Sequence, residues 1–179
     1  MIELNTKNKA EVFKEEIDMI TTKEVKDFIR KSVDLFPDYF WIENHISPYP
    51  NSNSNGLIVD HTKKVIKLLD EMLIAYDSSD VLRDIAIAAA IIHEGWVRGE
   101  SNNKDVDPFY NLYPRKKLLE KQYNLIIPEG IWRGIMDTIE GHLGEFTVIP
   151  KIKPQKGNPA FLLHLADFLV DNKNVDIMV

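Results

Sequence analysis

The sequence predicts an all-α protein, a single domain built from six or seven helices. Apolar residues recur at helical spacing in several separate stretches of the chain. No alternating run rich in β-branched residues indicates a sheet. Residues typical of helix starts and stops stand at the ends of several stretches. The 179 residues suffice for one domain, spanning 1–179, with a substantial hydrophobic core.

The first third of the chain holds two expected helices and a long loop. Residues 1–20 are of uncertain order, with a short amphipathic helix expected over their second half. Thr21 is predicted to cap a helix that ends near Leu35, because a glutamate follows three residues later. The segment 37–56 is predicted to be a loop, because it is rich in proline and ends in a polar run. The aromatic cluster at residues 39–41 indicates that this loop is anchored and functional.

Five further helices are predicted from apolar residues at helical spacing, and they span about 60–76, 80–94, 113–123, 128–141 and 158–171. Asp60 and Asp80 are candidate N-caps for the first two. Gly95 fits the left-handed residue that often closes a helix. Residues 97–108 and 150–157 are predicted to be connecting segments.

The amino-acid composition excludes several kinds of site and of partner. The chain has no cysteine, which excludes a disulfide framework, a zinc–thiolate site and a thiol nucleophile. Any metal site must therefore use His, Asp and Glu. A net charge of -6 argues against a partner such as polymeric nucleic acid. No apolar run approaches the ~20 residues of a membrane span, and the N-terminus lacks a secretory pattern. We therefore expect a cytoplasmic protein without a membrane partner.

An alanine-rich apolar run at 85–92 ends in His93 and Glu94. Eight such residues in a row favour a buried helix, so its last two side chains are delivered at the end of a core element. Imidazole and carboxylate are the groups that bind metal ions or move protons. An alternative is a plain helix C-terminus with the imidazole against the last carbonyls.

Four other residues are candidates of varying strength. His61 lies in the first turn of its predicted helix, and His142 follows a helix end. Asp167 lies inside the last helix among apolar neighbours, where a carboxylate needs a partner or a metal ion. Taken singly, a surface histidine or a salt-bridged aspartate explains these positions as well. His45, in the loop, is predicted to be solvated.

Taken in order, His61, His93 with Glu94, and Asp167 resemble the HD-domain superfamily of metal-dependent phosphohydrolases. That family has a first histidine, a histidine–aspartate doublet and a distal aspartate. The surrounding residues are similar too, at 56–62, 89–94 and 163–169, and two more stretches, at 37–41 and 139–146, resemble a small phage and bacterial branch. The chain differs from the family in having Glu94 where relatives have aspartate. It also has Tyr113 before a proline where this branch often has histidine.

The resemblance implies an all-α fold and one divalent metal ion (Mn, Fe, Zn, Co or Mg). Four side chains would hold the ion: His61, His93, Glu94 and Asp167. Besides Glu94, the residues expected to take part in catalysis are Arg98, His142 and Glu145. Those expected to bind substrate are Trp41, Trp96, Lys64 and Arg115, with the tryptophans stacking on a base.

The implied activity is hydrolysis of a phosphate ester in a small phosphorylated substrate, a nucleotide such as a deoxynucleoside mono- or triphosphate. Cyclic nucleotides and alarmones are substrates of other relatives. Glu94 motivates an alternative, a catalytically weak HD-like protein that binds a nucleotide or a protein partner without turnover. A helical scaffold without a ligand is a third reading. Compact relatives often assemble as a homo-oligomer, and the sequence leaves the oligomeric state open.

Overall fold

The computed structural model describes residues 9–49, 56–146 and 158–172, and in these ranges the chain is helical. The six longer helices are α3 (Lys23–Val33), α5 (Ile58–Ala75), α6 (Asp80–Ile92), α7 (Tyr113–Glu120), α8 (Glu129–Gly141) and α9 (Pro159–Asp171). Three short ones are α1 (Lys9–Val12), α2 (Lys14–Asp18) and α4 (Tyr39–Ile42). Three 3-10 turns, η1 (Tyr110–Leu112), η2 (Tyr123–Leu125) and η3 (Gly144–Phe146), complete the described part.

The predicted all-α class is confirmed. The described residues form nine α-helices rather than six or seven, because the helix expected over 10–20 is split in two and α4 lies inside the predicted loop 37–56. The one β-type contact in the described ranges is an isolated bridge between Asn44 and Leu57. None of the described helices combines the length and apolar character needed to cross a bilayer.

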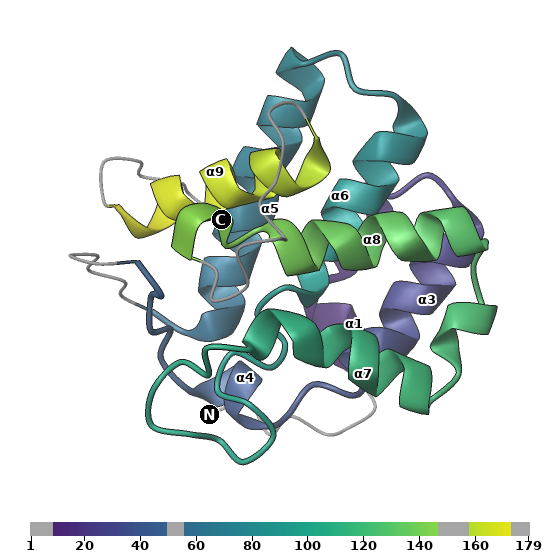
Figure 1. The fold of residues 1–179 in the computed structure, drawn as a ribbon. Helices are drawn as coiled ribbons and strands as arrows, with labels where there is room; N and C mark the ends of the chain where they lie inside the picture. The colour runs from purple at the N-terminus through teal and green to yellow at the C-terminus, as the bar shows by residue number, and fades with distance from the viewer. Residues whose placement is uncertain (1–8, 50–55, 147–157, 173–179) are drawn as a thin grey trace.

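Helix α6 lies at the centre of the bundle. It packs against α5 and α8, and it also contacts α3 and α9 (Figure 1). Each residue from Ala86 to Ile92 is fully buried, which explains why this second half of the helix is apolar on all sides. Gly134 lets α8 approach closely, because a Cβ atom there would lie 2.9 Å from the side chain of Ile85. The end of α6 is thereby fixed inside the core.

The link between the N-terminal helices and α6 differs from the prediction. Thr21 is not the N-cap of α3; that position belongs to Thr22, whose side chain makes no capping bond. The buried carboxylate of Asp84 instead accepts hydrogen bonds from the Thr21 N–H (2.7 Å), the Thr21 hydroxyl (3.0 Å) and the Thr22 N–H (2.9 Å). A side chain of α6 therefore satisfies the free N–H groups that precede α3.

Two other caps also differ. Helix α5 begins at Ile58, so Asp60 lies in its first turn rather than at its N-cap. Ser79, not Asp80, caps α6, and its hydroxyl accepts a hydrogen bond from a backbone N–H in the first turn. These are shifts of one to three residues, within the range over which helix ends are hard to place. The predicted starts of α8 and α9, near residues 128 and 158, agree with the structure, where Pro128 and Asn158 are the N-cap residues.

Gly95 is not in the left-handed conformation predicted for it. A Cβ atom at this position would lie 2.8 Å from the ring of Phe36. The glycine is therefore explained by close packing under an aromatic ring rather than by backbone conformation. The segment 150–157, predicted as a connector, lies outside the described residues.

Candidate metal centre

Seven imidazole and carboxylate side chains meet at the C-terminal end of α6. This histidine–carboxylate cluster consists of His45, His61, His93, Glu94, His142, Asp167 and Asp171, and none of its members is more than 5% exposed. His93 ends α6 and His142 ends α8, while α5 contributes a histidine from its first turn. The two aspartates are one turn apart on α9, which places them on one face of that helix. Elements far apart in the sequence thus converge on one buried point.

His93 and Glu94 carry ligand atoms without hydrogen-bond partners. Nδ1 of His93 lies 2.6 Å from the carbonyl oxygen of Ala90, which can only accept, so Nδ1 carries the hydrogen. In the neutral ring the lone pair is then on Nε2, which is buried and has no hydrogen bond. Neither carboxylate oxygen of Glu94 accepts a hydrogen bond, and Nδ1 of His45 lies at the longer ion-pair distance of 3.5 Å from its Oε2. Burying polar atoms without hydrogen bonds costs folding free energy. A cation bound to His93 Nε2 and to the two oxygens of Glu94 would compensate for this cost.

The other two predicted ligands are in contact with each other. His61 Nε2 lies 2.9 Å from Asp167 Oδ1, and His93 Nε2 lies 3.8 Å from the same oxygen. The second oxygen of Asp167 accepts a hydrogen bond from the hydroxyl of Tyr49 at 2.8 Å. Nitrogen and oxygen atoms of His61, His93 and Asp167 all lie within 4.8 Å of one another. This group of three could therefore hold a metal ion.

Glu94 belongs to a neighbouring group. Its carboxylate, His93 and His142 also have ligand atoms within 4.8 Å of one another. His93 is common to both groups, and its Nε2 lies 3.9 Å from Glu94 Oε1. The structure thus places the four predicted ligands side by side, with His93 between the carboxylates of Glu94 and Asp167.

Three histidines of the cluster bind protons more tightly than an ordinary histidine. Burial alone lowers the pKa of His45, but its hydrogen bond to Asp171 and its contact with the carboxylate of Glu94 outweigh this effect and raise the pKa to about 10. The pKa values of His61 and His93 are raised in the same way, since their carboxylate partners outweigh the effect of burial. Without a metal ion, protons on these rings therefore supply the positive charge that balances the neighbouring carboxylates.

The carboxylates show the complementary shifts. Burial raises the pKa of Asp171, but hydrogen bonds from two histidines outweigh it and lower the pKa to about 2. The pKa of Asp167 is held well below its usual range, and that of Glu94 is lowered, again because histidine contacts outweigh burial. All three carboxylates are therefore ionised near neutral pH and supply three negative charges to a small buried volume.

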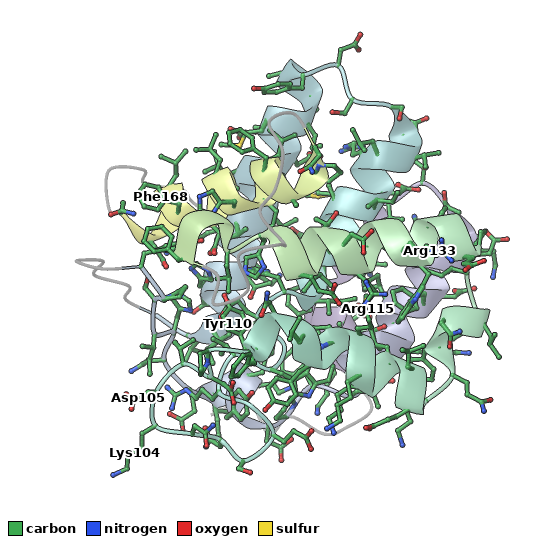
Figure 2. The ribbon with its side chains drawn as sticks, viewed as in Figure 1. Lys104, Asp105, Tyr110, Arg115, Arg133 and Phe168 are labelled. Atoms are coloured by element: carbon green, nitrogen blue, oxygen red, sulfur yellow. The ribbon has the colours of Figure 1, made fainter. Side chains whose placement is uncertain are left out.

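His142 is different, because burial lowers its pKa to about 4. Its Nδ1–H donates to the carbonyl of Ile139 at 2.5 Å, so Nε2 carries a lone pair. That lone pair accepts a hydrogen bond from the hydroxyl of Tyr110 at 3.0 Å, and Figure 2 labels this tyrosine. His142, predicted as a residue of the catalytic site, is indeed beside the cluster as a neutral ring whose two nitrogens are both engaged.

The structure places Trp41 and Trp96 in the core rather than at a ligand-facing surface. They are 4% and 2% exposed, and both rings pack against Phe36 at centroid distances of 6.1 and 5.4 Å. The expectation that these tryptophans stack on a base is therefore corrected. Trp41 packs on Phe36 and Phe40, and these contacts anchor the start of the 37–56 segment in the core.

The predicted cationic residues also have other partners. Arg98 donates from Nη2 to the carbonyl of Asn44 at 2.9 Å, which fixes the segment just before His45. Arg115, labelled in Figure 2, forms ion pairs with carboxylates of α8 and holds α7 against that helix. Lys64 lies partly exposed on α5, outside the histidine–carboxylate cluster. The side chain of Glu145 lies outside the described part of the structure.

Four residues of the site were not found from the sequence. His45 was predicted to be solvated but is 4% exposed and lies in the cluster. Tyr49 lies in an irregular segment and Tyr110 begins the short 3-10 turn η1, and neither place gives a helical spacing that could be read from the sequence. Asp171 could have been found, because it follows Asp167 by one helical turn on a helix already predicted.

Comparison of the chain with protein-family models, with curated proteins and with solved structures found no match.

Proposed function

We propose that this protein is a metal-dependent phosphohydrolase of the HD type that cleaves a phosphate ester of a nucleotide. The observation that carries the proposal is the set of three buried ligand atoms without hydrogen bonds on His93 and Glu94, beside the contact between His61 and Asp167. These residues follow one another along the chain in the order of the family pattern. Their convergence in space is independent support, because the same order could occur in residues that lie far apart. The motif resemblance supports the reaction class, and the geometry supports the metal.

The donor set fits a divalent ion with a preference for nitrogen and oxygen. Two imidazoles and two carboxylates suit Zn, Mn, Fe or Co, and carboxylates alone would suit Mg. When bound, such an ion lowers the pKa of a coordinated water and draws charge from a phosphoryl oxygen. Tyr49 holds the carboxylate of Asp167 in place from the side opposite His61, so the chain itself orients this ligand.

A binding protein without turnover is the second candidate. Its supporting observation is that every member of the histidine–carboxylate cluster is at least 95% buried, which favours a closed site over an open one. Glu94 in place of aspartate is consistent with this candidate too. Both candidates share the metal ion, and they differ in whether a phosphate ester is cleaved.

The test begins with the metal content of the purified protein, followed by phosphate release from a panel of nucleotides. The panel contains deoxynucleoside mono- and triphosphates, a cyclic nucleotide and an alarmone, each with Mn, Fe, Zn, Co or Mg. We expect one ion per chain and turnover that Asp167→Ala abolishes. Asp84→Asn is the matched control, because Asp84 is a buried, hydrogen-bonded aspartate on α6 outside the cluster.

Metal without release under any ion would favour the binding protein. Neither metal nor release would rule out both candidates and leave the helical scaffold. Turnover that persists in Asp167→Ala would show that the reaction takes place elsewhere.

A further inference from the structure

We propose that His45 and Asp171 are positioning residues of the metal centre, with Asp171 orienting the ring of His61 and His45 holding the carboxylate of Glu94. The inference rests on the metal-binding part of the proposed function. It assigns a role to two residues that neither the motif nor the family pattern includes.

The first step is the contact between Asp171 and His61. Nδ1 of His61 lies 3.3 Å from Asp171 Oδ1, while its Nε2 faces Asp167. If Nδ1 carries the hydrogen and donates it to Asp171, the lone pair of the neutral ring is on Nε2, the atom that faces the proposed metal position. A carboxylate behind a ligating histidine commonly fixes the ring and its tautomer in this way.

The second step is the bridge made by His45. Its Nε2 lies 3.1 Å from Asp171 Oδ1, and its Nδ1 lies 3.5 Å from Glu94 Oε2. One imidazole thus connects the carboxylate that orients His61 with the carboxylate predicted to bind the ion. Glutamate is one methylene longer than the aspartate of the family pattern, so a shortened side chain at position 94 would draw its carboxylate away from His45.

The backbone holds His45 in this place. Its N–H donates to the carbonyl of Gly56 at 2.9 Å, and the N–H of Ile58 donates to the carbonyl of Glu43 at 3.0 Å. Together with the bridge between Asn44 and Leu57, these bonds tie the loop to the start of α5, the helix that carries His61. His45 therefore reaches the cluster from a fixed base, as a positioning residue requires.

A second metal ion between His45, His61 and Asp171 is the competing explanation, since their ligand atoms also lie within 4.8 Å of one another. The two rings, however, are stacked at 3.7 Å with an angle of only 6° between their planes. Lone pairs of imidazole lie in the ring plane, so those of parallel stacked rings do not converge on one ion at about 2.1 Å. Hydrogen bonds to a shared carboxylate fit this arrangement better than coordination.

The experiment measures the dissociation constant for Zn²⁺ alone, by competition with a chromogenic chelator, together with urea unfolding of the metal-free protein. Asp171→Asn and His45→Ala are each expected to weaken Zn²⁺ binding about 10- to 100-fold. His45→Gln places an amide near the Nε2 position and is expected to recover part of the loss through Asp171. Asp84→Asn again serves as the control, with lowered stability and unchanged Zn²⁺ affinity.

A double-mutant cycle tests the bridge to Glu94. In a Glu94→Asp background the carboxylate no longer reaches His45, so His45→Ala should weaken Zn²⁺ binding by a smaller factor than in the wild-type background, through Asp171 alone. Zn²⁺ affinities equal to that of the wild type in Asp171→Asn, His45→Gln and His45→Ala, whatever their stability, would overturn the proposal. So would equal effects of His45→Ala in both backgrounds.

The outcomes separate this inference from the proposed function. A wild-type protein that binds no Zn²⁺ would overturn the metal centre and the positioning roles together. A protein that binds Zn²⁺ but releases no phosphate would contradict the hydrolase alone, and the comparison of affinities would stand.

Discussion

A bound divalent ion is expected to stabilise this protein, and to do so more strongly as the pH rises. Ion that binds only the folded chain adds ~2.7 kcal/mol when its free concentration is 100 times the dissociation constant. For a chain of this size, 1 kcal/mol moves the unfolding midpoint by roughly 2–4 °C, so the expected increase is about 5–11 °C. Thermal unfolding of the chelator-treated protein with and without Zn²⁺ or Mn²⁺ measures it.

The pH dependence follows from the histidines. The pKa of His45 is about 10 in the folded protein against 6.5 for an ordinary histidine. Its stabilising contribution to the metal-free protein is therefore fully present below about pH 6.5 and is lost as the pH rises through about 10. The pKa values of His61 and His93 are raised too, and an ion must displace protons from these rings. The metal-free protein thus loses stability between pH 6.5 and 8.5 while the stabilisation by metal grows.

The refuting results are specific. An increase in the midpoint that shrinks between pH 6.5 and 8.5 would show that protons and metal do not compete for this cluster. An equal increase in His93→Ala would place the ion elsewhere, because His93 belongs to both groups that contain Asp167 or Glu94. Asp84→Asn should keep the full increase from a lower starting midpoint.

Two further predictions concern stability. Asp84→Asn should cost about 1–3 kcal/mol, because a carboxylate that accepts three hydrogen bonds from Thr21 and Thr22 is replaced by an amide. The pKa of Asp84 is lowered because these bonds outweigh burial, so the difference between wild type and variant in urea unfolding should shrink as the pH falls below about 3.8. Gly144→Ala should cost roughly 1–3 kcal/mol in the same assay, since Gly144 has φ +58° and a Cβ atom there would lie 2.6 Å from the ring of His164. A Gly144→Ala midpoint equal to that of the wild type would contradict this packing.

The helices could be predicted because, within each segment, apolar residues recur at the spacing of an α-helix. Helix α6 shows this best, since alanine and isoleucine over residues 85–92 specify a buried helix without reference to any other segment. The start of α3 was harder to predict, because its partner is remote in sequence. Nothing near Thr21 indicates that its N–H and its hydroxyl both donate to Asp84, 63 residues further along.

The candidate site was predictable where its residues lie on helices. His61, His93 and Asp167 were chosen from their positions at helix ends or among apolar neighbours, and they converge. His45 could not be chosen, because its place depends on hydrogen bonds between the loop and the start of α5. The burial of Trp41 was missed for a related reason, since an aromatic residue in a loop can equally cover a core or face a ligand.

The cluster joins parts of the chain that are far apart in sequence. His45 meets Asp171 across 126 residues, and His61 meets Asp167 across 106. Contacts of such long range form only after most of the chain has been ordered, because closing a long loop costs entropy before the contact is made. The pairing of α9 with α5 therefore makes the histidine–carboxylate cluster a product of completed folding. A nascent chain would assemble the cluster only after α9 has been synthesised and docked.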